Sequence, residues 1–411
     1  MWNMKHVFRL IAFTALAVSM ACTRSFVQDD YFVCAYVWPS CHDDSLAREW
    51  LWPDGDGEWE VIKKGDPRFE GHYQPRQPLW GYEHDDDPEV VERWIQIALK
   101  HGVNTFVYDW YWYNAPDGYS GPYLEDALNK GFLGAPSNQK MNFFLMYANH
   151  DVKYNYWNYH KWGDRTDLLF NPRVGMDDWK KIVSRVITQY FHLPNYTRID
   201  GCPVFAMFSI DIFKQGFSSD EEAYAAMEYF REEVKKAGFP DLFLQYTPGD
   251  ASSLARKDPE RMKRDFEKMG VNSIACYNMG GFNPDYLTHC KRSVEIREQL
   301  TEQYDIPVFP TVSIGWDDTP RFPAKGAEHV TRFHNTPACF ATCLKKAKDY
   351  ADAHRGTQPP FIMINAWNEW VEGSYLLPDC LNGYGYLEAV RDVFEGKYDA
   401  DSYKACKGLE I

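Results

Sequence analysis

The sequence predicts an α/β fold, a (β/α)8 barrel of the TIM type with long loops after its strands. Eight short apolar runs recur along the chain, and segments of helix length separate them. Near-continuous apolar strands that are each followed by a helix are typical of a parallel sheet covered by helices. A doubly wound sheet would usually carry a glycine-rich turn after its first strand, whereas Trp38 and Pro39 follow the first run here.

The elements can be placed in chain order. A helix is expected to begin at Pro88, with Asp87 as its N-cap, because proline suits the first helical position. Apolar residues at three- and four-residue spacing predict further helices. The predicted strands are 32–38, 105–112, 141–147, 203–210, 242–246, 273–277, 308–314 and 361–366, and the further helices are 220–236, 258–269, 285–303 and 331–354.

The loop after the first strand, 39–82, is unusually long and rich in Trp, Gly, Asp and Pro. Structureless loops of this length are uncommon, so we expect it to be elaborated and to serve as a functional lid. The chain shows no low-complexity linker and no shift in composition, which predicts a single catalytic domain over residues 23–411.

Composition narrows the classes of ligand. The net charge of −15 argues against nucleic acid, which requires basic patches. Aromatic residues make up 17% of the chain. A large aromatic core explains most of them, but those at strand ends could also line a carbohydrate cleft. The ten cysteines show no zinc-site spacing, so we expect neither a metal nor another cofactor, and the disulfide pattern stays open.

The N-terminus reads as a targeting segment. Lys5 and Arg9 lead into the apolar run 10–20, which is too short to span a bilayer. Residues 19–22 then resemble the lipobox of bacterial lipoprotein precursors, which predicts a signal peptide over 1–22 and lipidation of Cys22. The alternative is an ordinary secretory signal cleaved near Ala21. We expect an exported, membrane-anchored bacterial lipoprotein in the periplasm or on the cell surface, attached to the membrane only through this anchor.

Glu369 and Glu372 are the strongest catalytic candidates. They follow the last apolar run, beside Trp367 and Trp370. Two carboxyl groups with aromatic walls suit glycosidic-bond chemistry, in which one moves a proton and the other stabilises or attacks. The non-catalytic alternatives are a structural role in a buried ion pair for Glu369 and a solvated loop position for Glu372. The two side chains can converge only if the chain turns after Asn368; a separation of about 5 Å would suit a retaining mechanism and a wider one an inverting mechanism.

Polar and aromatic residues also stand at or just beyond the last residues of the other predicted strands, at the end where such barrels build their active sites. A single polar residue there could simply be a helix cap, but the repetition predicts a ligand site. The candidate sugar-contacting residues are Tyr36, Trp38, Asp109, Trp110, Tyr111, Trp112, Asn149, His150, Tyr246, Tyr277, Trp316, Trp367, Asn368 and Trp370.

Three segments resemble a known family. Residues 71–76, 108–113 and 365–379 are similar to the WbsX-like proteins, which are related to the family 99 glycoside hydrolases, the endo-α-mannosidases. The resemblance spans nearly the whole chain after the signal segment. It implies a (β/α)8 barrel with carbohydrate as its ligand, and it adds His72 and Tyr73 to the candidate sugar contacts.

The resemblance also implies roles for the two acids. Glu369 would be the base that activates the sugar 2-hydroxyl in a retaining mechanism through a 1,2-anhydro sugar. Glu372 would protonate the leaving oxygen and then activate water. We therefore expect a secreted or lipid-anchored glycoside hydrolase, with α-mannoside-like chemistry, acting on a polysaccharide or oligosaccharide. The alternatives are a glycosyltransferase of polysaccharide biosynthesis, or a glycan-binding lipoprotein without catalysis.

Overall fold

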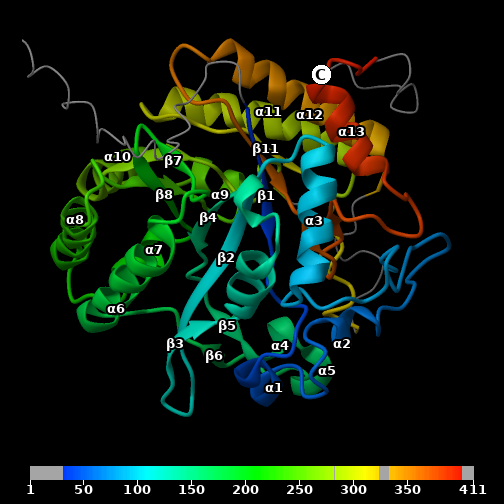
Figure 1. Ribbon diagram of the computed structural model, residues 1–411, viewed down its shortest axis with the longest axis horizontal. Coiled ribbons are helices and arrows are strands. Elements are labelled where there is room, and N and C mark those ends of the chain that lie inside the picture. The colour runs from blue at the N-terminus through cyan, green and yellow to red at the C-terminus, as the bar shows by residue number, and fades with distance from the viewer. Residues whose placement is uncertain (1–30, 282, 324–332, 400–411) are drawn as a thin grey trace, which may run out of the picture.

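The structure is a computed structural model that describes residues 31–281, 283–323 and 333–399 (Figure 1). The predicted signal peptide and Cys22 lie outside these residues, so export and lipidation stay predictions. The described chain forms a parallel sheet that curls on itself, with helices around it. The predicted barrel is confirmed.

Eight parallel strands form the wall of the barrel. They are β1 (Phe32–Val37), β2 (Thr105–Asn114), β4 (Asn142–Tyr147), β8 (Cys202–Met207), β9 (Phe243–Tyr246), β10 (Val271–Ile274), β11 (Thr311–Ser313) and β12 (Phe361–Asn365). Each overlaps one of the eight predicted runs. Their order in the sheet is β10-β9-β8-β4-β2-β1-β12-β11. The two ends meet, because Ile274 N donates to Pro307 O and Phe309 N donates to Ile274 O, both at 2.8 Å.

Helices surround this wall (Figure 1). The larger ones follow the strands as α3 (Pro88–Lys100), α6 (Met176–Val186), α8 (Asp220–Lys236), α10 (Pro259–Met269), α11 (Tyr286–Gln303), α12 (Pro337–Ala353) and α13 (Gly385–Phe394). Between β2 and β4 the helical part is short and consists of the π-helix η1 (Ala127–Phe132) and a 3-10 turn, η2 (Asn138–Lys140). Short elements fill the loops: α4 (Tyr154–Trp157), α5 (Tyr159–Trp162), η3 (Ile187–Phe191), α7 (Ile210–Lys214), α9 (Ala251–Ala255), and the strands β3 (Ser120–Tyr123), β5 (Val152–Lys153), β6 (Leu168–Phe170) and β7 (Arg198–Ile199).

Capping explains where the helices begin. The Asp87 side chain accepts a hydrogen bond from Glu89 N at 2.8 Å, and Pro88 takes the first helical position, as predicted. Helix α12 begins at Pro337 rather than at the predicted residue 331. Thr336 caps it, and a proline lacks the N–H that a helix interior needs, so the helix starts there.

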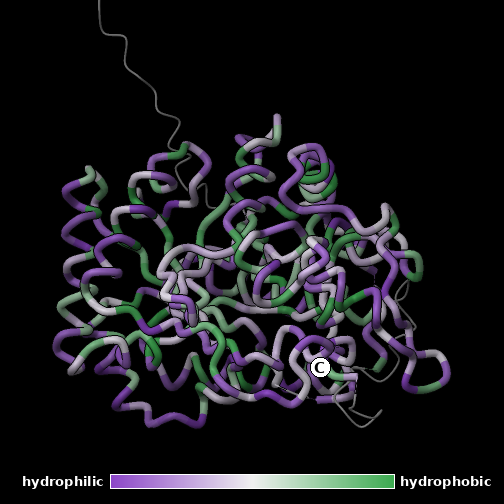
Figure 2. Tube along the Cα trace, turned by 90° about the horizontal axis from the view of Figure 1, so that it is seen from below, coloured by the Kyte–Doolittle hydropathy of each residue, from purple (hydrophilic) through white to green (hydrophobic). Residues whose placement is uncertain are grey.

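Hydrophobic burial places the core inside the wall and between wall and helices. The strand segments 33–37 and 361–366 are almost entirely buried. Hydrophilic segments lie mainly along the periphery in Figure 2, as expected for helices with one outward face. No helix within the described ranges combines the length and apolar character needed to cross a membrane.

The long loop after β1 is elaborated as predicted. It contains α1 (Ser45–Trp50) and α2 (Trp59–Ile62), and much of it is buried. Several of its side chains reach the end of the barrel where β11 and β12 finish, as described below. The loop is therefore a built part of that end of the barrel.

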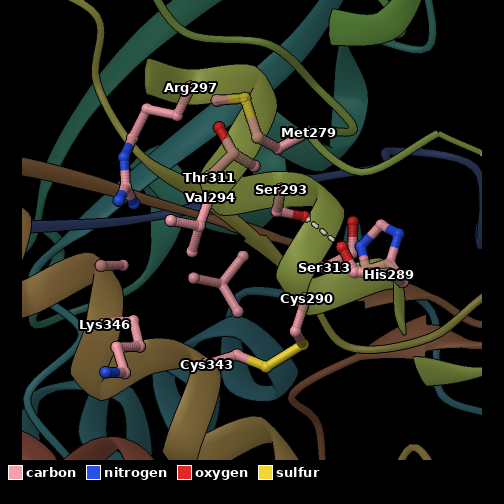
Figure 3. Close-up of a pocket in the computed structure, with 12 residues that line it drawn as sticks. Met279, His289, Cys290, Ser293, Val294, Arg297, Thr311, Ser313, Cys343 and Lys346 are labelled. Carbon is pink, nitrogen blue, oxygen red and sulfur yellow. Dashed lines mark hydrogen bonds between the residues drawn. A yellow bond between two sulfur atoms is a disulfide. The ribbon is translucent and has the colours of Figure 1, made fainter. Parts of the chain in front are cut away.

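A disulfide joins the outer helices α11 and α12. Cys290 on α11 and Cys343 on α12 are bonded across a separation of 53 residues, beside a small cavity that Figure 3 shows. The sequence could not assign this pair, because the spacing of the cysteines follows no known pattern.

Replacing both Cys290 and Cys343 with Ala should lower the free energy of unfolding by about 2–4 kcal/mol, because the cross-link restricts the unfolded chain. Urea unfolding of the oxidised protein, followed by tryptophan fluorescence, measures the loss. Cys202→Ala, which removes an unpaired thiol, is the control. A double variant as stable as this control would contradict the prediction.

Candidate active site

A tight hairpin follows β12 and carries both candidate acids. Its strands are β13 (Asn368–Glu369) and β14 (Ser374–Tyr375), and Glu369 pairs with Ser374. The turn closes at Gly373, whose φ of 65° is the left-handed conformation that suits glycine. The chain thus reverses direction between Glu369 and Glu372, as convergence of the two side chains requires.

Bonds to two other loops hold this hairpin. The Asn368 side chain accepts from Trp38 N at 2.8 Å and donates to Trp38 O at 2.7 Å, which ties the hairpin to the end of β1. Arg76, from the long first loop, donates to Trp370 O at 3.0 Å. The backbone of Asp317, after β11, donates to Glu372 O at 2.6 Å.

The two acids face one cavity of about 500 Å³ at the carboxyl ends of the strands. Its wall is largely aromatic. The aromatic residues that line it are Trp38, Tyr111, Tyr156, Trp157, Phe208, Tyr277 and Trp316. Polar groups stand beside the two acids: Asp109, His150, Asp151, Lys153, Asp250, Asn278 and Arg321. A concave site that combines aromatic walls with convergent polar groups is typical of a small-molecule or sugar site.

Glu369 is buried with little to stabilise a charge. It is 5% exposed; one oxygen accepts a hydrogen bond from Tyr277 Oη at 3.4 Å, and the other has no partner among the described residues. Burial raises the pKa of Glu369 well above its ordinary value, and repulsion from Glu372 adds to this rise. A carboxyl group in this setting keeps its proton at pH values at which an exposed glutamate has already lost it.

Glu372 differs because a cation touches it. Arg321 Nη1 donates to Glu372 Oε1 at 2.7 Å. Burial raises the pKa of Glu372, and the charge of Arg321 opposes the rise. When no ligand is bound, Glu372 is therefore the acid of the pair that more readily carries the negative charge, and Glu369 is the one that more readily keeps the proton.

Two further polar groups face the cavity. Burial, and then repulsion from Glu372, raise the pKa of Asp109 well above its ordinary value. Burial lowers the pKa of His150 to about 4, so its ring is neutral at neutral pH. A neutral imidazole and a buried carboxyl group are suited to hydrogen-bonding the hydroxyl groups of a sugar.

The structure brings together eight of the predicted site residues. Trp38, Asp109, Tyr111, His150, Tyr277, Trp316, Glu369 and Glu372 all line this cavity. Others point away because side chains alternate along a strand. On β2, Asp109 and Tyr111 face the cavity, whereas Trp110 donates to Glu125 at 2.7 Å and Trp112 to Ser120 at 3.3 Å.

Several predicted contacts pack within the protein instead. Tyr36 packs against Tyr277, with ring centroids 4.7 Å apart. Tyr246 packs against Phe266. Trp367 packs against Phe106, with ring centroids 4.9 Å apart.

Trp370 stacks on Tyr375, with ring centroids 3.9 Å apart. The Asn149 amide bonds to Ser209 N and Ser209 O, each at 2.8 Å. None of these residues, nor Asn368, is among those that line the cavity.

His72 and Tyr73 lie in a neighbouring cavity of about 270 Å³, which shares Trp316 with the first. His72 Nε2 bonds to Asp317 at 2.7 Å, and Tyr73 donates to Gln77 O at 3.3 Å. Burial acts to raise the pKa of Asp317, but Arg76 and His72 hold it well below the ordinary range. This cluster fixes the loop after β11 to the first loop.

The sequence analysis did not identify Arg321 or Glu58, which is the second carboxylate that Arg321 binds besides Glu372. Arg321 Nε donates to Glu58 at 3.0 Å, across 263 residues. Nothing in the local sequence marks either residue. The sequence analysis also did not identify Tyr156, Trp157 and Phe208, which lie beyond the strand ends.

Among the described residues, no group of three His, Cys, Asp or Glu side chains could hold a metal ion.

Comparison with known proteins places the chain in a family. The model described as glycosyltransferase WbsX matches residues 33–390. The chain belongs to the WbsX family. The protein WxcX of Xanthomonas campestris pv. campestris is 25% identical over 370 residues, which cover 87% of this WbsX-family chain and 48% of WxcX. The chain thus spans about half the length of the curated relatives that it matches.

Solved structures share the fold. The GH99 endo-α-mannosidase from Bacteroides thetaiotaomicron, in complex with BIS-TRIS-propane, gives a TM-score of 0.57 at 14% identity, covering 92% of this chain and 99% of that one. A glycoside hydrolase-like protein gives 0.54 at 14% identity, covering 89% and 94%. These likenesses show that this WbsX-family chain shares its barrel fold with both proteins.

Gly373→Ala should destabilise the WbsX-family protein by about 1–2 kcal/mol, because an L side chain is strained at this φ. The added Cβ would also lie 2.4 Å from Arg76 Nη2. Gly383→Ala is the matched control: its φ is 56°, but no atom lies within 4 Å of the added Cβ. Thermal unfolding should show the larger loss for Gly373→Ala. Equal losses would mean that the Arg76 contact does not matter.

Glu369→Gln should stabilise the protein at pH 7.5 by about 1–3 kcal/mol and change little near pH 4. A carboxyl group whose pKa rises on folding costs nothing at low pH, where it is protonated in both states, and costs more as pH rises above its unfolded pKa. Urea unfolding at both pH values tests this, with the exposed Glu388→Gln as control. A stability loss at pH 7.5 would contradict the burial argument.

Proposed function

We propose that the protein is a glycoside hydrolase that cleaves glycosidic bonds in an oligosaccharide or polysaccharide. The observation that carries this proposal is the pair Glu369 and Glu372, buried together in one aromatic cavity. Glycosidic-bond cleavage needs two carboxyl groups on either side of the bond, with one protonated. Burial and mutual repulsion are what keep one proton on such a pair at neutral pH.

In the proposed reaction, Glu369 accepts the proton of the sugar 2-hydroxyl while that oxygen attacks the anomeric carbon and forms a 1,2-anhydro sugar. Glu372 gives its proton to the leaving oxygen and then takes one from the water that attacks the anomeric carbon and opens the 1,2-anhydro ring, while Glu369 returns its proton to the 2-oxygen. The free site favours the proton on Glu369, so substrate binding must move it to Glu372. A hydroxyl group that donates to Glu369 would favour the charged form of that residue and drive this exchange.

The walls of the cavity suit a sugar chain. Trp38, Tyr111 and Trp316 offer apolar ring faces, and His150 and Asp109 offer hydrogen-bonding groups for hydroxyl groups. Ring faces and hydrogen-bonding groups of this kind bind neutral, hydroxyl-rich ligands well.

The finer proposal, that the substrate is an α-mannoside, rests on the likeness to the family 99 fold.

Glycosyltransfer is the second candidate, because the family carries that description. Transfer from a nucleotide sugar requires a place for a diphosphate. The cavity lining holds five carboxyl groups, on Asp109, Asp151, Asp250, Glu369 and Glu372, and two cations, Lys153 and Arg321; Arg321 is already bonded to two carboxylates. Like charges at close range disfavour a diphosphate there. Hydrolysis is therefore the better supported function.

We also propose that the protein works outside the cytoplasm as a lipid-anchored protein. The lipobox-like residues 19–22 are the sequence support. The Cys290–Cys343 disulfide is consistent with this location, because structural disulfides persist mainly in oxidising compartments.

The purified mature protein should release oligosaccharides from at least one member of a polysaccharide panel, sized by mass spectrometry. Glu372→Gln and Glu369→Gln should each lower the rate on natural glycans by about 10²–10⁴-fold, since each removes a proton-transfer step. Glu388→Gln, an exposed change on α13, should leave the rate unaltered.

Two other outcomes would overturn the hydrolase, and a third would overturn the role of Glu372. Thermal stabilisation by nucleotide sugars, with transfer and no hydrolysis, would support the transferase. Glycan affinity unchanged in both Gln variants, without product, would support a binding protein. Wild-type rates in Glu372→Gln would remove that residue from the mechanism.

A further inference from the structure

Arg321 sits between two carboxylates and is almost fully buried. Its side chain is 2% exposed. One end, Nη1, donates to Glu372, while Nε and Nη2 both reach Glu58 Oε1, at 3.0 and 2.9 Å. A planar guanidinium can serve two carboxylates at once in a fixed geometry, which a lysine ammonium cannot do.

Glu58 is itself held firmly. It is fully buried, and its second oxygen accepts from Trp38 Nε1 at 2.5 Å and Ser40 Oγ at 3.2 Å. Trp38 also lines the cavity and is bound to the hairpin through Asn368. Three loops therefore meet at Arg321: the first loop through Glu58, the loop after β11, and the hairpin through Glu372.

In this arrangement the positive charge of Arg321 interacts with two carboxylates, Glu58 and Glu372. Burial raises the pKa of Glu372; the Arg321 charge lowers it, and the charges of Asp318 and Glu58 raise it again. Glu58 takes two of the three Arg321 contacts with these carboxylates, so part of the arginine's pull on Glu372 is offset. An acid that must both give and take a proton works best when neither form is strongly favoured.

We propose that Arg321 and Glu58 form a positioning pair that fixes the carboxyl group of Glu372 and balances its gain and loss of a proton. This inference rests on the hydrolase proposal for its catalytic meaning. Neither residue is assigned contact with the substrate; both act through Glu372.

Other titratable or charged groups face Glu372 and must stay constant in any test. They come from several elements around the cavity. These groups are Glu369 on β13, Asp109 and Tyr111 on β2, His150 and Asp151 after β4, Lys153 on β5, Tyr156 on α4, Asp250 after β9, Tyr277 after β10, and Asp318 after β11. Only changes at Arg321 and Glu58 are therefore compared.

The direct test is a pH titration of the Glu372 carboxyl group by infrared difference spectroscopy on the whole protein. The carboxyl band that disappears in Glu372→Gln identifies this residue. Arg321→Met should raise the protonation midpoint by about one pH unit or more, because a neighbouring cation is lost. Glu58→Gln, which keeps the shape of the side chain, should lower it, because Arg321 then acts on Glu372 alone.

Arg321→Lys supplies the test of position. It keeps the charge, so the midpoint should stay close to that of the wild type. Glycan turnover should still fall at least tenfold, since one ammonium cannot hold both carboxylates. Arg231→Met is the matched control: Arg231 is another buried arginine, bonded to Leu242 O and Gly270 O at the opposite end of the strands, and its loss should leave the midpoint unchanged.

Opposite shifts in Arg321→Met and Glu58→Gln support the pair. Shifts in the same direction, or none beyond that of Arg231→Met, overturn it. Because the titration needs no substrate, a wild-type protein that hydrolyses nothing would refute the hydrolase while the infrared result still decides whether Arg321 and Glu58 control Glu372.

Discussion

Repulsion between two buried carboxyl groups is the constraint on which the rest of this site depends. Glu369 and Glu372 come from one hairpin and face one cavity, so a negative charge on one disfavours a negative charge on the other. Both have raised pKa values, chiefly through burial. Such an arrangement costs stability and persists only where the surrounding structure holds it in place.

The surrounding loops supply that support. Asn368 binds the backbone of Trp38, Arg76 binds the backbone of Trp370, and Arg321 binds Glu372. Each bond joins the hairpin to a different part of the chain. The long first loop is thus more than a cover, because it carries Glu58 and Arg76 to the site. A barrel with rigid strands and elaborated loops is a frequent way to place catalytic groups.

Much of the fold could be read from the sequence, because it rests on local patterns. Apolar runs located all eight strands, and Asp87 with Pro88 marked the start of α3. The same patterns led to Glu369, which follows the last apolar run, and to Asp109, which lies within the run that forms β2. Alternation was the missed local signal: Trp110 and Trp112 are one residue out of phase with Asp109 and Tyr111, and face away from the cavity.

Long-range contacts could not be read in this way. Arg321 meets Glu58 across 263 residues, and no spacing rule links them. Asn149 and Asn368 were predicted to contact the ligand because they stand just beyond predicted strands, where polar residues recur. In the structure they bond to backbone groups that only the folded barrel brings near.

The most direct test of the central claim is a crystal structure of Glu372→Gln with an oligosaccharide bound. We expect a glycosidic oxygen within hydrogen-bond reach of residue 372, and the 2-hydroxyl of the same sugar against Glu369. A sugar chain that crosses the cavity with neither residue near a glycosidic bond would contradict the claim that these two carboxyl groups act together.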